Sequence, residues 1–137
     1  MIRVLIVDNH QFFRQCLVAV INSSDGLEAI GECRDGGEVV DAVRELGPHV
    51  VLMDVRMGAT SGIDAVAALQ RDHAGVRVIM LTSETAAVSR AAARVNGASG
   101  YLLKGCGADA VGRAIHRVAA GHSAWPEEFA PAFTVAS

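Results

Sequence analysis

The sequence is poor in the residues that bind nucleic acids, insert into membranes or form disulfide frameworks. Aromatic residues make up only 4% of the chain, which leaves no stacking platform for single-stranded bases. The formal net charge of −3 and the isoelectric point of about 5.9 argue against independent binding to nucleic acid or to an anionic membrane. No apolar run approaches the length that spans a bilayer, so we expect no membrane association.

Cysteine is also scarce. Cys16, Cys33 and Cys106 are isolated from one another without a C-x-x-C pair, which signals neither a zinc site nor a disulfide framework. The N-terminal segment MIRVLIVDNH is a short apolar run that ends in an acid, unlike a signal peptide. We therefore expect a cytoplasmic protein.

The composition predicts one folded domain. The chain has 137 residues, of which 51% are hydrophobic and 20% charged, so it can bury a sizeable core. Residues 1–121 carry the periodic patterns of this domain. Residues 122–137 contain Pro126 and Pro131 among small residues and are expected to be a tail or the start of a linker.

Short apolar runs alternate with segments of helical period, which predicts a parallel sheet covered on both faces. The predicted strands are residues 2–7, 28–33, 50–54, 76–82 and 99–104. A helix follows each strand. The first carries Phe13, Leu17, Val20 and Ile21 on one face, and the second runs from Asp35 to Gly47-Pro48. The third opens at Ser61, the fourth covers about residues 84–96, and the fifth carries Val111, Ile115 and Val118. Five such units predict a doubly wound, three-layer α/β sandwich, for which the strand order 2-1-3-4-5 is one of the two common forms and the one we expect here.

Polar residues follow four of the predicted strands. Asp8 and Asn9, Asp54, Thr82 and Lys104 would all lie at one edge of the sheet, where doubly wound folds bind ligands. Taken singly, each has an ordinary explanation as a helix cap, a strand residue or a solvated charge. Their joint placement favours a site, because two neighbouring carboxylates need a cation, and Lys104 with a hard ion such as Mg²⁺ would supply it.

The segments VLIVDNH, VVLMDVRMGATSG, VIMLTS and NGASGYLLK resemble the receiver domain of two-component response regulators, the CheY-like family, and in particular its NarL/FixJ-like branch. The resemblance covers residues 2 to about 120. It implies that Asp54 takes a phosphoryl group from a sensor histidine kinase, with Thr82 and Lys104 assisting. It also implies a Mg²⁺ site formed by Asp8, Asn9, Asp54 and the Arg56 backbone carbonyl, and a switch in which Tyr101 follows Thr82 inward.

The implied protein is a switch that catalyses its own phosphorylation and dephosphorylation, and not a conventional turnover enzyme. The branch resemblance implies transcription control through a helix-turn-helix domain that these residues do not contain. The chain would then be either a receiver fragment or a stand-alone regulator acting through protein contacts. A homodimer through exposed helices is a further expectation from the family.

The sequence departs from the family pattern near the site. Asn9 replaces the second acid of the usual pair, which predicts weaker Mg²⁺ binding and slower phosphoryl transfer. Gly58 replaces the usual proline after Met57, and Gly105 follows Lys104 where an acid is common. The alternative is therefore a degenerate receiver that acts as an interaction module without phosphate.

Arg56 and Glu84 occupy positions that flank the phosphoryl group in the family. They have opposite charges, and we hypothesise that they pair across the site and obstruct the attacking water. Two solvated loop charges are the plain alternative.

Three other classes of protein fit less well. Residues 105–110 match G-x-G-x-x-A, but in the last unit and not the first, where a dinucleotide fingerprint belongs. A flavodoxin-like flavin binder needs an anion nest after the first strand, where this chain has an acid and bulky groups. A haloacid-dehalogenase-like phosphatase needs a second acid where His10 stands, and His10 is expected to be a surface residue at a helix start.

Overall fold

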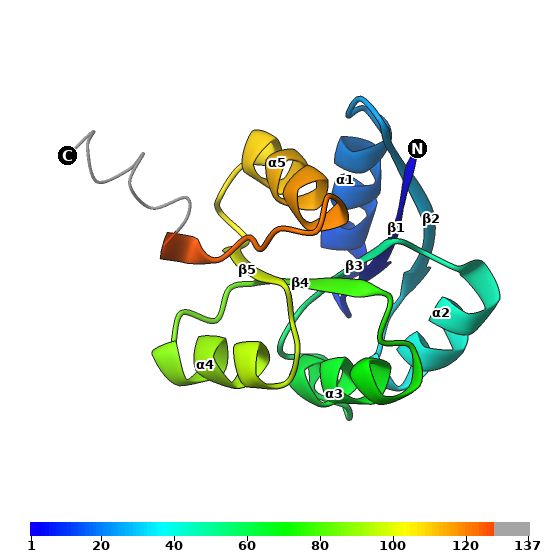
Figure 1. Cartoon of the computed structure of the whole chain (residues 1–137). Coiled ribbons are helices and arrows are strands. Elements are labelled where there is room, and N and C mark those ends of the chain that lie inside the picture. The colour runs from blue at the N-terminus through cyan, green and yellow to red at the C-terminus, as the bar shows by residue number, and fades with distance from the viewer. Residues whose placement is uncertain (128–137) are drawn as a thin grey trace.

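The computed structural model describes residues 1–127 of the chain. Strands and helices alternate along it (Figure 1). The strands are β1 (Ile2–Val7), β2 (Leu27–Cys33), β3 (Val50–Met53), β4 (Arg77–Thr82) and β5 (Gly100–Leu103). The helices are α1 (Gln11–Asn22), α2 (Val39–Leu46), α3 (Gly62–Asp72), α4 (Ala87–Val95) and α5 (Ala108–Ala119), and a 3₁₀ turn (Gly36–Glu38) precedes α2.

The five strands form one parallel sheet in the order β2-β1-β3-β4-β5, which confirms the predicted fold class. Helices α1 and α5 cover one face, and α2, α3 and α4 cover the other (Figure 1). In this order β1 and β3 are neighbours, with Val7 opposite Met53 at their carboxyl ends. The residues that follow these two strands are therefore adjacent, although the sequence separates them by more than forty positions.

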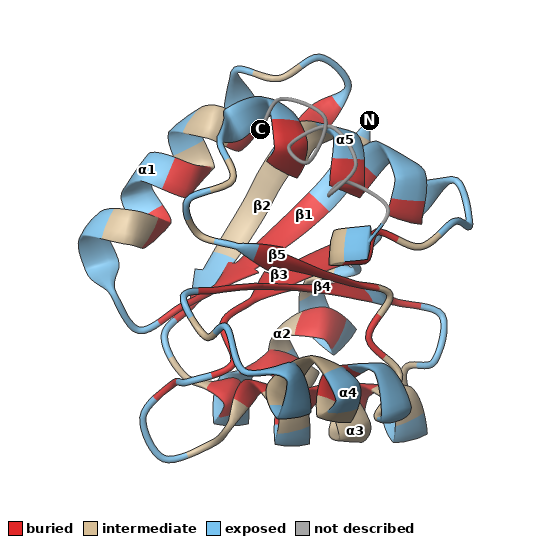
Figure 2. Ribbon diagram, turned by 90° about the vertical axis from the view of Figure 1, so that its left-hand side faces the viewer, coloured by how far each residue is buried: buried red, intermediate tan, exposed pale blue. Residues whose placement is uncertain are grey.

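Two apolar cores result from this layering, one on each face of the sheet (Figure 2). Strands β1, β3 and β4 are buried over most of their length because helices cover both of their faces. The face covered by α1 and α5 buries Leu17, Ile21 and the predicted Val111, Ile115 and Val118. The opposite face buries Val66, Leu69 and Tyr101.

Local sequence signals set the starts and ends of several helices. The Asp35 side chain accepts from the Gly37 amide and Glu38 caps back, so the predicted capping box is present, although the first turn is 3₁₀. The Ser61 hydroxyl accepts from the Ile63 amide at the start of α3. Helix α2 ends at Gly47, whose φ of 61° is left-handed and suits glycine.

Some predicted bounds were wrong. Strands β3, β4 and β5 are each one or two residues shorter than expected, so Asp54 and Lys104 lie just beyond strands and not within them. Helix α4 begins at Ala87 and not at Glu84, because the Glu84 carboxylate accepts from the Ala86 amide and holds the preceding residues as a loop. The apolar period could not show this, since it does not report loop hydrogen bonds.

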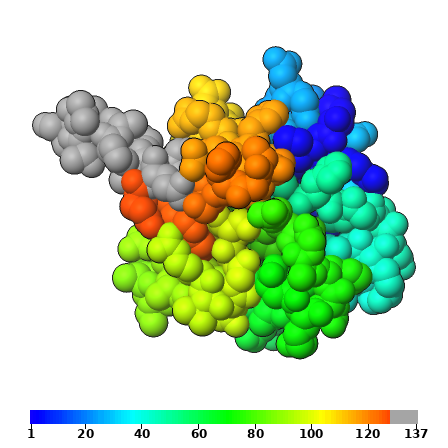
Figure 3. All heavy atoms as spheres, viewed as in Figure 1, coloured from blue at the N-terminus to red at the C-terminus, as the bar shows by residue number. Residues whose placement is uncertain are grey.

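The chain after α5 returns to the sheet. Ala124 forms a parallel bridge with Gly100 of β5, and Ala124 and Trp125 are 0% and 6% exposed. The expected tail thus contributes two core residues, because an alanine and a tryptophan cover apolar surface beside β5 that would otherwise face water. This stretch lies against α4 and α5 in the space-filling view (Figure 3). Residues 128–137 of the expected tail lie outside the described residues. No helix within residues 1–127 is long and apolar enough to cross a membrane.

Candidate functional site

The predicted site residues meet at the carboxyl edge of the sheet. Asp8 follows β1, Asp54 follows β3, Thr82 ends β4 and Lys104 follows β5. Asp8, Asp54 and Thr82 are 2%, 4% and 1% exposed, so the site lies below the protein surface. Asn9 is exposed beside it. A buried pair of carboxylates is costly unless cations or donors compensate both.

Lys104 provides that compensation. Its Nζ lies 2.7 Å from Asp8 Oδ2 and 2.9 Å from Asp54 Oδ2, so one ammonium bridges both carboxylates. Burial lowers the pKa of Lys104, but the contacts with Asp8 and Asp54 outweigh it and raise the pKa above the ordinary lysine value. The ammonium also lies 4.3 Å from the centre of the Phe13 ring, which favours its charged form.

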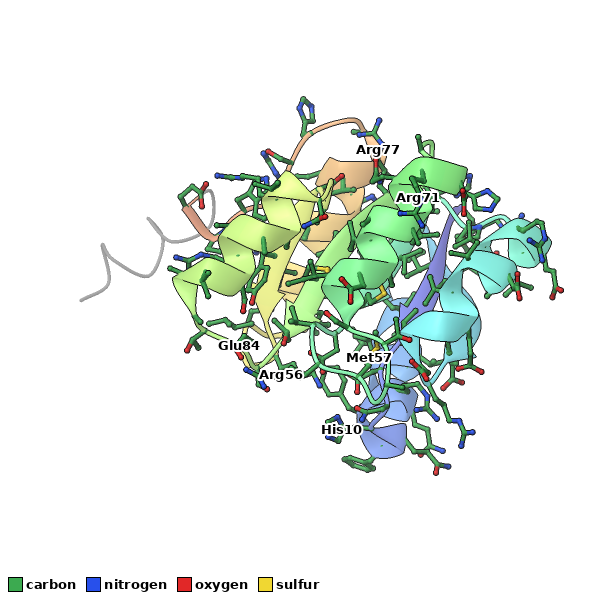
Figure 4. All side chains as sticks on the ribbon, turned by 90° about the horizontal axis from the view of Figure 1, so that it is seen from below. His10, Arg56, Met57, Arg71, Arg77 and Glu84 are labelled. Atoms are coloured by element: carbon green, nitrogen blue, oxygen red, sulfur yellow. The ribbon has the colours of Figure 1, made fainter. Side chains whose placement is uncertain are left out.

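His10, in the loop before α1, and Arg14, within α1, hold Asp8 on the side away from Lys104. The His10 amide donates to Asp8 Oδ1 at 2.8 Å, and the His10 ring Nδ1 lies 3.0 Å from the same oxygen. Arg14 donates from Nη1 to the Asp8 backbone carbonyl at 2.7 Å and from Nε to Glu32 at 3.1 Å. His10 is at a helix start and exposed, as predicted, yet it also contacts the site (Figure 4).

Arg14 was missed in the sequence analysis, and a signal for it existed. It shares the inward face of α1 with Leu17 and Ile21 and is 7% exposed. A lone arginine at the helical spacing of a buried apolar face needs a buried acceptor, which here is the Asp8 carbonyl. The sequence could have indicated this need but not the identity of the acceptor.

The donor set fits a hard divalent cation. Ligand atoms of Asp8, His10 and Asp54 all lie within 4.8 Å of one another, and two of the three are buried carboxylates. Carboxylate oxygen is the ligand that Mg²⁺ prefers. Asn9 contributes no charge, so the site has one acid fewer than the family pattern described above.

A second cluster lies around the loop between β4 and α4. Arg56 contacts Glu84 Oε2 through Nε at 2.7 Å and through Nη2 at 2.6 Å, so the predicted pairing of these side chains is present (Figure 4). The Ala86 amide and then Arg56 hold the pKa of Glu84 below its usual value. The Arg56 amide donates to Asp54 Oδ1 at 3.3 Å, which connects this cluster to the buried carboxylates.

Tyr101 contacts the same loop from the buried side. It is 1% exposed, and its hydroxyl donates to the Glu84 backbone carbonyl at 2.8 Å. The Glu84 amide in turn donates to the Thr82 hydroxyl at 3.1 Å. Burial, and next the charge of Glu84, raise the pKa of Tyr101 above its usual value, so the hydroxyl keeps its proton as a donor. The predicted switch residues are therefore joined through Glu84.

The loop after Asp54 contains glycine at position 58, where the family usually has a proline. Gly58 has a φ of 40°, which a proline ring cannot adopt. Gly62 lies directly against the Asp54 backbone, and a Cβ atom there would overlap the Asp54 carbonyl oxygen. The loop that follows Asp54 thus requires glycine twice, at Gly58 for its left-handed φ and at Gly62 for its close approach to the Asp54 backbone.

A sheet of this order with buried acids and a lysine at its carboxyl edge defines a class of α/β signalling domain, and comparison with known proteins agrees. The family model described as "Response regulator receiver domain" matches residues 4–116. The chain belongs to the response regulator receiver domain family.

Individual relatives support this membership. The chain is similar to the response regulator GacA of Pseudomonas protegens, with 38% identity over 88% of the chain and 57% of GacA. It is similar to the transcriptional regulatory protein LnrK of Bacillus subtilis, with 34% identity over 93% of the chain and 58% of LnrK. Among solved structures, the signal receiver domain of NarL from Mycobacterium tuberculosis has a TM-score of 0.85 at 27% identity, covering 88% of this chain and 98% of that domain. The chain thus spans a little over half the length of the curated relatives.

Proposed function

We propose that Asp54 accepts a phosphoryl group from the phosphohistidine of a sensor kinase, and that this modification switches the surface formed by α4, β5 and α5. The observation that carries the proposal is the placement of a buried Asp54 beside Asp8, with Lys104 contacting both carboxylates. A structural ion pair needs only one carboxylate. Two buried acids around one lysine suit a site that receives additional negative charge and a cation.

The chain's own residues support the transfer chemistry. A carboxylate oxygen of Asp54 attacks phosphorus, the bond from phosphorus to the donor breaks, and the donor leaves with the bonding pair, which forms an acyl phosphate. The Arg56 amide and Lys104 orient the Asp54 carboxylate before attack. Lys104 can follow the developing charge, since its Nζ already contacts Asp54 Oδ2.

The metal would be held by the carboxylates of Asp8 and Asp54, the amide oxygen of Asn9 and the Arg56 backbone carbonyl. Mg²⁺ bound there would neutralise negative charge on the phosphoryl oxygens. Lys104 balances the two acids when the cation is absent, and His10 holds Asp8 Oδ1 in place. Because Asn9 is uncharged, we expect weaker Mg²⁺ binding than in an Asn9→Asp variant.

The first test is intact mass spectrometry after incubation with Mg²⁺ and acetyl phosphate. We expect a phosphoryl mass increment in the wild type and none in Asp54→Asn. An Asn9→Asp variant should reach the same occupancy at a lower Mg²⁺ concentration. An increment that persists in Asp54→Asn would contradict the assignment. Absence of any increment at saturating donor and metal would favour the second candidate, a receiver that acts without phosphate, which the neutral Asn9 supports.

The Arg56–Glu84 ion pair would lengthen the life of the phosphorylated state. It spans the loops that follow β3 and β4, beside Asp54, where it would narrow the approach of water to phosphorus. We expect faster loss of phosphate in an Arg56→Ala, Glu84→Ala double variant than in wild type. The matched control is Asp41→Ala with Arg44→Ala, an exposed pair on α2. Equal rates in wild type and the first variant would refute this role.

We propose that the switched surface serves transcription control within a longer protein. One relative carries the printed name "Transcriptional regulatory protein", and the match covers little more than half of its length. The autophosphorylation and dephosphorylation of this domain would make it a switch and not a turnover enzyme. Its free cysteines suit a cytoplasmic location.

A further inference from the structure

Residues 122–127, which we name the C-terminal strap, extend the sheet beyond β5. The Tyr101 amide donates to the Ala124 carbonyl at 3.0 Å, and the Ala124 amide donates to the Ser99 carbonyl at 2.9 Å. Ala124 packs into the core under α1 and α5, whereas Trp125 packs into the core under α3 and α4. The strap thus behaves as a short added strand whose side chains alternate between the two faces.

The sequence contains the conditions for this arrangement. Trp125 precedes Pro126, which favours an extended backbone at Trp125. Gly100 offers no side chain to the strap, and a Cβ atom there would lie 2.7 Å from the Ala124 carbonyl oxygen. The strap therefore depends on glycine at position 100 of β5.

An arginine of helix α4 contacts two residues of the strap. The Arg94 guanidinium lies 4.1 Å from the centre of the Trp125 ring, and its Nη2 contacts Glu127 at 2.7 Å. Arg94, Trp125 and Glu127 line a shared hollow with Arg90 and two alanines of α4. A movement of α4 would therefore move the contacts that hold Trp125.

A chain of hydrogen bonds connects the strap with the site. Thr82 accepts from the Glu84 amide, the Glu84 carbonyl accepts from the Tyr101 hydroxyl, and the Tyr101 amide donates to Ala124. Tyr101 thus contacts the site loop with its side chain and the strap with its backbone.

We propose that the C-terminal strap is an output element whose seat on β5 and α4 depends on the state of the Asp54 site. The proposal rests on the phosphorylation of Asp54 proposed above. When the Thr82 hydroxyl turns toward a phosphoryl group, it gives up the Glu84 amide, and the loop that receives the Tyr101 hydroxyl shifts. The strap then loosens from β5 and α4, and Trp125 becomes more accessible to water. Coupling of this kind needs an element that can adopt two arrangements, and we propose the strap, seated or released, as that element.

Trp125 is the only tryptophan in the sequence, so fluorescence excited at the long-wavelength edge, where tyrosine does not absorb, reports on the strap and not on Tyr101. The experiment follows Trp125 emission and acrylamide quenching in the full chain while Mg²⁺ and acetyl phosphate are added. Intact mass is measured on the same samples. We expect a red shift and stronger quenching that grow with the phosphoryl increment, and neither change in Asp54→Asn.

Three variants make the test decisive. Gly100→Ala, which displaces the strap directly, should expose Trp125 without phosphate. Tyr101→Phe, which removes only the hydroxyl bound to the Glu84 carbonyl, should also strengthen quenching. Asp41→Asn, on the exposed surface of α2, should leave Trp125 unchanged.

Each outcome decides the proposal. A phosphoryl increment without any change at Trp125 overturns the strap and leaves the proposed function intact. If no increment forms, the proposed function fails, and the Tyr101→Phe variant tests the strap proposal by itself. Stronger quenching of Trp125 in this variant supports the link between the strap and the site loop, whereas unchanged quenching overturns the proposal. A Gly100→Ala variant with unchanged Trp125 emission would show that the strap is not seated on β5, which also overturns the proposal.

Discussion

Replacing Lys104 by methionine is the most direct test of how the site is held together. The substitution keeps an apolar stem and removes the ammonium between Asp8 and Asp54, whose side chains are 3% and 4% exposed. Removing one partner from a buried ion pair typically costs about 3–5 kcal/mol. Lys104 is itself 17% exposed, so water screens part of the interaction, and we expect a loss of about 3 kcal/mol in the free energy of unfolding.

The assay is urea unfolding at neutral pH of wild type, Lys104→Met, Asp54→Asn and the double variant. In the Asp54→Asn background one of the two stranded charges is already absent, so Lys104→Met should cost less, with a coupling energy of about 0.5–3 kcal/mol. Removing the exposed Arg44–Asp41 pair should change stability by about 0–1 kcal/mol. Equal costs of Lys104→Met in both backgrounds would refute the reasoning that the lysine compensates both acids.

The difference in stability between wild type and Lys104→Met should depend on pH in a definite direction. The pKa of Lys104 is raised in the folded protein, so the folded state binds this proton more tightly than the unfolded chain. The stabilisation is fully present below the ordinary value of 10.5 and is lost as the pH rises through the folded value. The stability difference between wild type and Lys104→Met should therefore stay constant from neutral pH to about pH 10 and shrink above it.

Further predictions concern the backbone near the site and the cysteines. Gly62→Ala should destabilise the protein by about 1–3 kcal/mol and lower phosphoryl occupancy, because the added Cβ overlaps the Asp54 carbonyl oxygen, whereas Gly75→Ala, with open space around it, should do neither. Urea unfolding and intact mass measure both effects. Burial raises the pKa of the Cys33 thiol to about 11, so iodoacetamide at pH 8 should alkylate the exposed Cys16 first and Cys33 only after unfolding. Peptide mapping that found Cys33 modified in the folded protein would contradict its burial.

Much of the fold followed from local pattern. Alternating apolar runs and helical periods predicted the five-stranded parallel sheet, because a buried parallel sheet requires those patterns in every unit. They left the strand order 2-1-3-4-5 as one of two common forms, and the structure has this order. The strand-end residues Asp8, Asp54, Thr82 and Lys104 followed from the same reasoning, since parallel strands bring their carboxyl ends to one edge. The pairing of Arg56 with Glu84 was predicted from positions in the family motif, and the structure contains it.

Other features were decided only when distant elements packed together. The start of α4 depends on a carboxylate that binds a loop amide, and the contact of Arg14 with Asp8 depends on how α1 lies across β1. Trp125 looked like part of a tail because short polar and proline-containing stretches have no period of their own. Its burial depends on an open edge at β5, a glycine at position 100 and an arginine on α4. Periodicity determines which face of an element is buried, whereas the partner of a single side chain is determined by tertiary contacts that no local pattern records.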